Sequence, residues 1–124
     1  MAGVTGIGGV FLRSSDPAAL AAWYRQTLDV AFAPDGSYAI FEGADGQPPS
    51  VFALFGPDDA YIGAPGHQDA MVNLRVDDLD AVMETRPPAG ARVEGPLSEA
   101  NGRFAWAHDP EGRRVELWEP AATD

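Results

Sequence analysis

The sequence predicts an α+β fold in one domain, residues 1–124, built from two βαβββ modules at residues 1–62 and 63–124. The first observation is an internal repeat, because residues 69–82 repeat residues 7–20 at a displacement of half the 124-residue chain. The second is the content of 14 Gly and 11 Pro, which indicates short elements joined by turns. Two similar modules that fold together create a concave seam, where small molecules usually bind.

The first module begins with an apolar strand at residues 4–13 and continues into a helix. Asp16 is the predicted N-cap and Pro17 the first helical residue, where its missing N–H costs nothing. The helix extends to about Leu28, and its residues at helical spacing are expected to face inward: Leu20, Trp23, Tyr24 and Leu28. Three more strands are predicted at residues 30–32, 37–42 and 50–55.

The second module repeats this plan with a strand at residues 70–76 and a helix capped by Asp78. Arg86-Pro-Pro is expected to stop this helix after about two turns. A short strand is predicted at Val93. The last two strands, at residues 102–108 and 113–119, are predicted to pair across the Asp109-Pro-Glu-Gly turn.

The composition limits the classes of partner. The formal net charge of −11 argues against nucleic acid and anionic membrane, because phosphates would be repelled. The absence of cysteine excludes disulfides, thiolate metal sites and a cysteine nucleophile. No apolar run is long enough to span a bilayer and no signal peptide opens the chain, so we expect a cytoplasmic protein.

Three features together resemble the vicinal oxygen chelate superfamily, which holds glyoxalase I, extradiol dioxygenases, fosfomycin-resistance enzymes and bleomycin-resistance proteins. They are the paired modules, the segment Leu74-Arg-Val-Asp-Asp-Leu-Asp80 and the ending Asp109-Pro-Glu-Gly-Arg-Arg-Val-Glu-Leu-Trp-Glu119. The resemblance covers nearly the whole chain and implies the glyoxalase/bleomycin-resistance/dioxygenase-like fold. It does not fix the reaction, because this scaffold hosts many chemistries.

The resemblance also implies four metal-ligand positions, and they fall on Gly9, Ala53, Met71 and Glu116. Glu116 alone keeps the ligand type of the metal-dependent members. One carboxylate cannot hold a divalent metal tightly, since such sites need three or four protein ligands. We therefore expect no metal at the family position and no other cofactor.

With Gly9 and Met71 on the cleft side by resemblance, strand alternation predicts which side chains share that side. The predicted ligand-binding residues are Phe11, Arg13, Met71, Asn73, Arg75, Phe104, Trp106 and Trp118. Because Gly9 has no side chain, one interpretation is that it leaves room for a ligand at the floor of the cleft. The alternative interpretation is that Gly9 only bends the strand and that Met71 fills the space as a core residue. Glu116 is the candidate catalytic residue, as a general base or as the partner of a ligand cation. The alternative is a structural ion pair between Glu116 and an arginine.

These residues favour a small-molecule-binding protein of the bleomycin-resistance kind, a homodimer that takes an organic ligand, cationic or aromatic, without metal. The alternative is a lyase, isomerase or dioxygenase-related enzyme that uses Glu116 as general base or as the remaining metal ligand, with Arg13 or Arg75 stabilising an oxyanion. A dimer without a ligand is the third possibility. Whether the modules pair within one chain or swap between two stays open.

Overall fold

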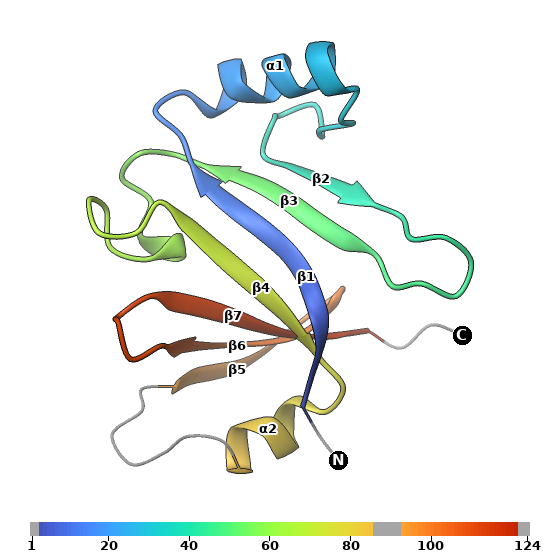
Figure 1. Cartoon of the computed structure of the whole chain (residues 1–124), viewed down its shortest axis with the longest axis vertical. Coiled ribbons are helices and arrows are strands. Elements are labelled where there is room, and N and C mark those ends of the chain that lie inside the picture. Colours follow the sequence, from blue (N-terminus) through green and yellow to red (C-terminus); the bar gives the residue numbers. More distant parts are fainter. Residues whose placement is uncertain (1–2, 86–92, 122–124) are drawn as a thin grey trace. The chain divides into compact units, whose positions relative to one another are not determined.

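The computed structural model describes residues 3–85 and 93–121, and its helices and strands confirm the α+β class (Figure 1). The chain divides into two compact units. The α1 unit is Gly9–Met71, and the α2 unit combines Met1–Gly8 with Val72–Asp124. Strands β1 (Val4–Arg13) and β4 (Ala70–Val76) each contribute residues to both units. Both strands have the bounds that the sequence predicts.

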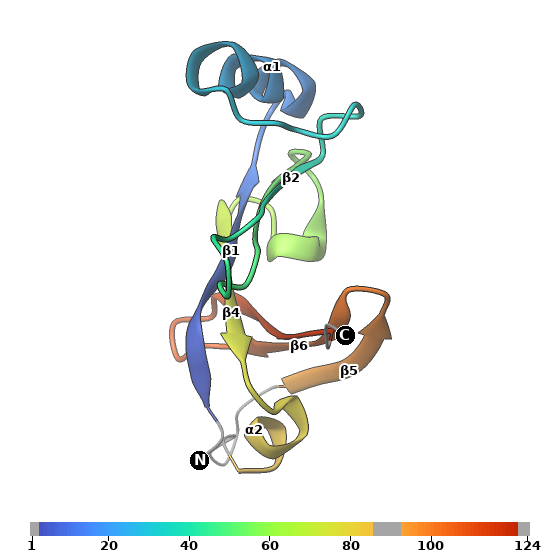
Figure 2. The same cartoon turned by 90° about the vertical axis from the view of Figure 1, so that its right-hand side faces the viewer.

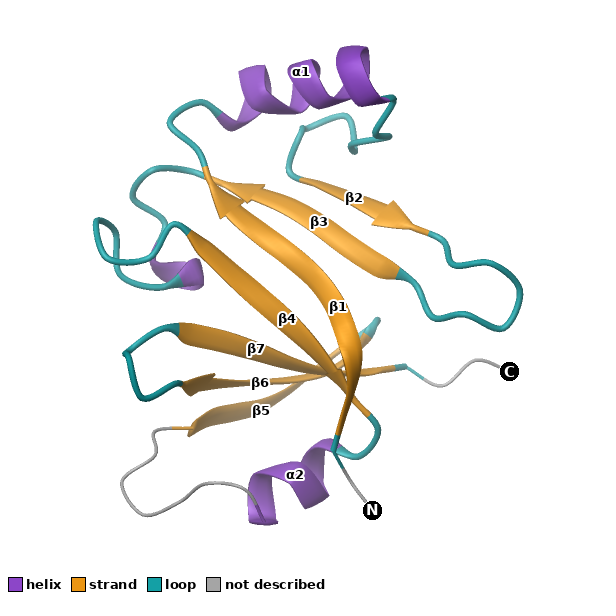
Figure 3. Cartoon of the chain, viewed as in Figure 1, coloured by secondary structure: helices purple, strands orange, loops and turns teal. Residues whose placement is uncertain are grey.

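In the α1 unit, a helix covers one face of a small mixed sheet. The sheet has the order β2–β3–β1, with β3 parallel to β1 and antiparallel to β2 (Figure 3). Its further elements are α1 (Pro17–Leu28), β2 (Tyr38–Phe41), β3 (Ser50–Phe55) and the short 3-10 helix η1 (Ala60–Ile62). The buried core between helix and sheet consists of Ala21, Phe32, Ala39 and Leu54.

Helix α1 starts as predicted, because the Asp16 carboxylate accepts the backbone N–H of Ala19 at 3.1 Å and Pro17 follows it. The expected inward stripe is wrong in part. Trp23 is 50% exposed and Leu28, the last helical residue, is 59% exposed. The buried face is centred on Ala21, and the Trp23 ring is nearly perpendicular to that of Tyr24, with 5.0 Å between the ring centroids.

The strand predicted at residues 30–32 does not form. The N–H of Val30 donates to the carbonyl of Tyr24 at 3.2 Å, and that of Phe32 donates to the carbonyl of Val30 at 3.0 Å. The backbone N–H groups of Val30 and Phe32 therefore bond to the end of the helix and within a local turn, and not to a neighbouring strand. The apolar side chains of the segment still belong to the core, because Phe32 is buried in it and Val30 packs against it.

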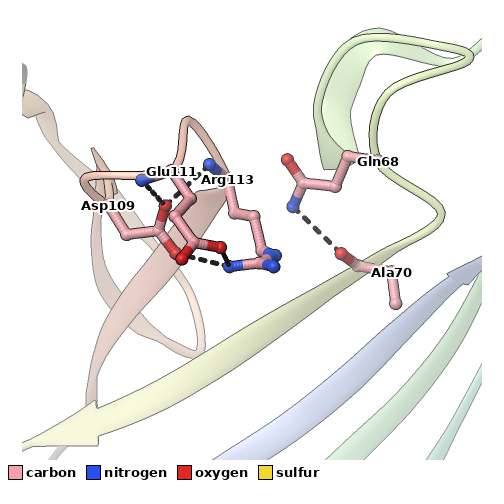
Figure 4. Close-up of polar contacts among 5 residues, drawn as sticks. All are labelled: Gln68, Ala70, Asp109, Glu111 and Arg113. Atoms are coloured by element: carbon pink, nitrogen blue, oxygen red, sulfur yellow. Dashed lines mark hydrogen bonds and ion pairs between the residues drawn. The ribbon is translucent and has the colours of Figure 1, made fainter.

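Arg13, at the end of β1, holds the loop that connects β3 to β4. Its guanidinium donates to carbonyls spread along this loop, at 2.8–3.1 Å to the oxygens of Pro57, Asp59, Gly63 and Gln68. The side-chain amide of Gln68 extends the network with a 2.9 Å bond to the carbonyl of Ala70 (Figure 4). A planar fork with five N–H groups suits such a task, since it satisfies several carbonyls at once.

In the α2 unit, the short helix α2 (Leu79–Thr85) packs on a sheet with the strand order β4–β7–β6–β5 (Figure 1 and Figure 2). Strand β4 is parallel to β7, whereas β6 is antiparallel to both of its neighbours, β7 and β5. The remaining strands are β5 (Val93–Glu99), β6 (Gly102–His108) and β7 (Arg114–Pro120). The buried core under α2 consists of Val76, Leu79, Val82 and Ala105. The predicted stop at Arg86-Pro-Pro lies outside the described residues.

Two acidic side chains cap the start of α2. Asp78 accepts the N–H of Ala81 at 3.1 Å, which confirms the predicted cap. Glu119 of β7 accepts the N–H of Leu79 at 2.7 Å. The helix is thus fastened to the sheet by a polar contact as well as by its apolar face. No helix within residues 3–85 and 93–121 is long and apolar enough to cross a membrane.

The predicted hairpin between β6 and β7 is confirmed, and its turn is organised by Asp109. The Asp109 carboxylate accepts the backbone N–H groups of Arg113 and Glu111, both at 2.9 Å (Figure 4). These bonds, that from Arg113 first, hold the pKa of Asp109 below its ordinary value. Arg113 adds ion pairs to Glu111 at 2.9 Å and to Asp109 at 3.4 Å, which the surrounding water weakens.

The role of Arg13 predicts the effect of its replacement. Arg13→Met keeps much of the apolar stem and leaves several loop carbonyls without their donor, so the free energy of unfolding should fall by about 2 kcal/mol or more. Arg25→Met is the matched control, because among the described residues Arg25 donates to one carbonyl, that of Ala33, at 2.9 Å. Its expected loss is about 1 kcal/mol. Urea unfolding measures both, and equal losses would contradict the structural role of Arg13.

Candidate functional site

Six of the predicted site residues lie on one face of the α2 unit's sheet, which we call the Glu116 face. Pairing across β4, β7 and β6 aligns them in two rows. The rows are Asn73–Glu116–Trp106 and Arg75–Trp118–Phe104. Because strand residues alternate between faces, their neighbours point the other way, and Val76, Ala105 and Leu117 pack around α2. The same alternation therefore builds both the core and the candidate site.

Glu116 occupies the centre of the first row and is 1% exposed. Its oxygen Oε1 accepts the side-chain amide N–H of Asn73 at 2.6 Å, and Oε2 accepts the indole N–H of Trp106 at 2.9 Å. Among the described residues it is the only buried Asp or Glu. A buried carboxylate is costly unless hydrogen bonds compensate for the lost water, and these two neutral donors supply that compensation.

Trp106 joins this carboxylate to a basic residue of the neighbouring strand. The guanidinium of Arg114 lies over the Trp106 ring, 5.0 Å from its centroid. Arg114 also lies 3.6 Å from a carboxylate oxygen of Glu94. The cation–π contact helps to hold the Trp106 ring in place. Because Arg114 belongs to β7 and Trp106 to β6, both strands orient the indole N–H that donates to Glu116.

The second row is mainly aromatic. The rings of Phe104 and Trp118 are parallel within 2°, with their centroids 6.1 Å apart. The Trp118 indole donates to the carbonyl of Asn101 at 3.0 Å. Arg75 donates to the carbonyl of Ile7 at 2.9 Å. The repeat arginines Arg13 and Arg75 therefore both bind backbone carbonyls, although we expected them to face a ligand.

The strand alternation expected for β1 needs a correction. The resemblance placed Gly9 on the cleft side of this strand. A Cβ on Gly8 would overlap Asn73 Oδ1 and lie 2.9 Å from the Trp118 ring. A Cβ on Gly9 would instead overlap the carbonyl of Val51. Gly8 thus faces Asn73. Residues 6, 8 and 9 are glycines, so this part of β1 has few side chains from which the register can be predicted.

The other three predicted ligand-binding residues, Phe11, Arg13 and Met71, belong to the α1 unit. Phe11 is buried against Phe55 and Tyr61, at 5.6 and 6.4 Å between ring centroids. Met71 is fully buried. Phe11 has neighbours that sequence reasoning missed. Strand spacing could have found Phe55, which pairs with Arg13, whereas Tyr61 lies in a segment without a periodic signal.

The donor set does not fit the metal that the superfamily resemblance implies. Both oxygens of Glu116 accept N–H groups, which compete for the lone pairs that a metal would need. Ala53, Gly9 and Met71 offer no carboxylate or imidazole. In the described part of the chain, no three His, Cys, Asp or Glu side chains come together as a possible metal site.

Comparison with known proteins supports the resemblance. Residues 9–118 match the model of the glyoxalase-like domain family. No curated protein matches the sequence. A methylmalonyl-CoA epimerase variant from Streptomyces coelicolor, in complex with 2-nitronate-propionyl-CoA, is 21% identical, with a TM-score of 0.70 over 97% of this chain and 100% of that chain. Methylmalonyl-CoA epimerase from Mycobacterium tuberculosis is 22% identical, with a TM-score of 0.63 over 96% and 90%.

Both structures are too distant in sequence to establish more than the fold. The family match spans most of the chain and agrees with the repeat, the strand bounds and the ending of the sequence. The chain belongs to the glyoxalase-like domain family, within the vicinal oxygen chelate superfamily.

Proposed function

We propose that this chain binds a small organic molecule on the Glu116 face, without a metal at the family position. The supporting observation is Glu116 itself, a buried carboxylate held by Asn73 and Trp106 next to an aromatic row. A few oriented polar groups among aromatic side chains are typical of small-molecule sites.

The proposed ligand is partly apolar and either cationic or aromatic, as for a protein of the bleomycin-resistance kind. Phe104 and Trp118 supply ring surface, and Glu116 supplies negative charge. The net charge of −11 favours the approach of cations over that of anions. A drug that carries positive charge and flat rings matches these groups.

A second candidate function is catalysis, with Glu116 as general base in a proton transfer next to a carbonyl. It is favoured by the burial of Glu116, which shields the carboxylate from water. The methylmalonyl-CoA epimerases among the structural neighbours add support through the shared fold. In such a step the proton on carbon moves to a Glu116 oxygen, the electron pair of the broken C–H bond forms a carbon–carbon double bond, and the π pair of the carbonyl moves to its oxygen.

We also propose that the chain acts as a homodimer in the cytoplasm. The α2 unit exposes the aliphatic side chains Val4, Ile7 and Val72, which suit contact with a second copy. The absence of cysteine suits a reducing compartment.

The binding proposal predicts a fluorescence response, because Trp106 and Trp118 lie on the Glu116 face. A bleomycin-type glycopeptide should quench tryptophan emission and raise the Tm of the protein. Glu116→Gln should weaken this binding at least about tenfold, since it removes the buried charge. Glu111→Gln, at an exposed turn position, is the matched control and should leave binding unchanged. Equal affinity of both variants and the parent would refute the role of Glu116.

The proposed absence of metal is checked by elemental analysis of protein purified without chelator. We expect zinc, nickel, iron and manganese far below one equivalent per chain, since the family position offers a single carboxylate. A full equivalent of one divalent metal, lost in Glu116→Gln, would overturn this part of the proposal and favour a metal enzyme.

The two candidate functions are separated by isotope exchange. In D₂O with methylmalonyl-CoA, a protein that only binds ligands should leave the hydrogen next to the carbonyl in place. Mass spectrometry measures this exchange. Deuterium uptake that slows at least about a hundredfold in Glu116→Gln would establish the catalytic function instead.

A further inference from the structure

An extra residue in β5 determines which face of the sheet Leu97 occupies. From the pair Glu94–Trp106 to the pair Leu97–Phe104, β5 advances three residues while β6 advances two. Such a bulge shifts the alternation of the following side chains by one residue. In regular pairing Leu97 would lie on the other side of the sheet, which packs on α2. The bulge places it instead beside Phe104, on the Glu116 face.

Gly95 provides the backbone conformation of this bulge. Its φ is +103°, a value that residues with a Cβ rarely adopt. A Cβ at this position would also lie 3.0 Å from the carbonyl oxygen of Phe104 and 3.1 Å from Ala105 Cα. Bulges are frequent next to functional sites, where they re-aim a side chain. The local sequence is thus fitted to turning Leu97 toward Phe104.

Leu97 is the accessible end of the aromatic row. Trp118 is 4% exposed, Phe104 is half-buried, and Leu97, in the strand at the edge of the sheet, is 47% exposed. The stacked rings of Phe104 and Trp118 continue the row inward from Leu97. A ligand that approaches this face therefore first contacts the row at Leu97 and Phe104.

The edge of the sheet at β5 is unsuited to pairing with a strand of another chain. The strand contains Pro96, which has no N–H to donate, and it carries the exposed carboxylates of Glu94 and Glu99. Proline, charged side chains and bulges are the features that prevent edge strands from pairing with further strands. The exposed apolar surface at Leu97 therefore suits a small molecule better than an added strand.

We propose that Leu97 and Phe104 bind a flat ring of the ligand, and that Leu97 is a specificity-determining residue of the site. This inference rests on the proposed function and names the place that the ring occupies. A ring laid on Leu97 and against the Phe104 ring removes apolar surface of both side chains from water. A compact polar ligand gains little from this contact, so the pair selects ligands that carry a ring system.

Leu97→Ala tests this contact with the bleomycin-type glycopeptide as the probe. The loss of exposed aliphatic surface should weaken binding about fivefold or more, measured by tryptophan fluorescence. Leu97→Met keeps an apolar side chain of similar volume and should bind within about twofold of the parent. Ile40→Ala is the matched control, because Ile40 of β2 is 48% exposed and lies in the α1 unit, and it should leave the affinity unchanged.

NMR locates the ring on the protein. We expect nuclear Overhauser effects between the aromatic protons of the glycopeptide and the methyl groups of Leu97. Unchanged affinity in Leu97→Ala, or the absence of these effects from the complex, would overturn the inference. Dissociation of a homodimer in Leu97→Ala, measured by sedimentation, would also overturn it, because Leu97 would then contact a second copy of the chain.

The affinities of two variants distinguish failure of this inference from failure of the proposed function. If Glu116→Gln weakens glycopeptide binding and Leu97→Ala does not, this inference fails and the proposed function stands. If the parent protein does not bind the glycopeptide, both fail.

Discussion

The burial of the Glu116 carboxylate is the constraint on which the candidate site depends. A buried negative charge is tolerated only where donors are fixed close to it, and here the donors come from strands on either side of β7. Asn73 and Trp106 therefore have little freedom. Arg114 holds Trp106 from above its ring. The polar centre is thus specified by two strand pairings, that of β7 with the distant strand β4 and that of β7 with its hairpin partner β6.

The repeat arginines show how two similar modules use one residue type. Arg13 and Arg75 occupy equivalent positions, and each directs its guanidinium to backbone carbonyls of its own unit. Arg13 donates hydrogen bonds to several carbonyls of the loop between β3 and β4, whereas Arg75 donates to the carbonyl of Ile7 in β1. Arginine suits both tasks because its charge and its fixed fork stabilise several backbone carbonyls at once. The repeat thus preserves a structural function, while the groups proposed to bind a ligand differ between the modules.

Much of the fold could be predicted because local signals agree with tertiary packing. The caps Asp16 and Asp78 and the turn at Asp109 act within a few residues of their own position. The segment at residues 30–32 shows the limit, since its apolar residues fit either a strand or a core turn. Trp23 was expected inside because its spacing is helical, but the width of the contact face is set by the sheet that the helix meets.

The sequence by itself determined the class of the fold, most of the strands and helices, and the residue types of the candidate site. Together with the family resemblance, alternation along each strand predicted that Glu116, Asn73 and Trp106 belong to the candidate site. Tertiary structure alone decided that these three are hydrogen-bonded and that Gly8 faces Asn73. The physical reason is that register between strands depends on pairing across the sheet, and the adjacent glycines Gly8 and Gly9 have no side chains that would favour one register over the next.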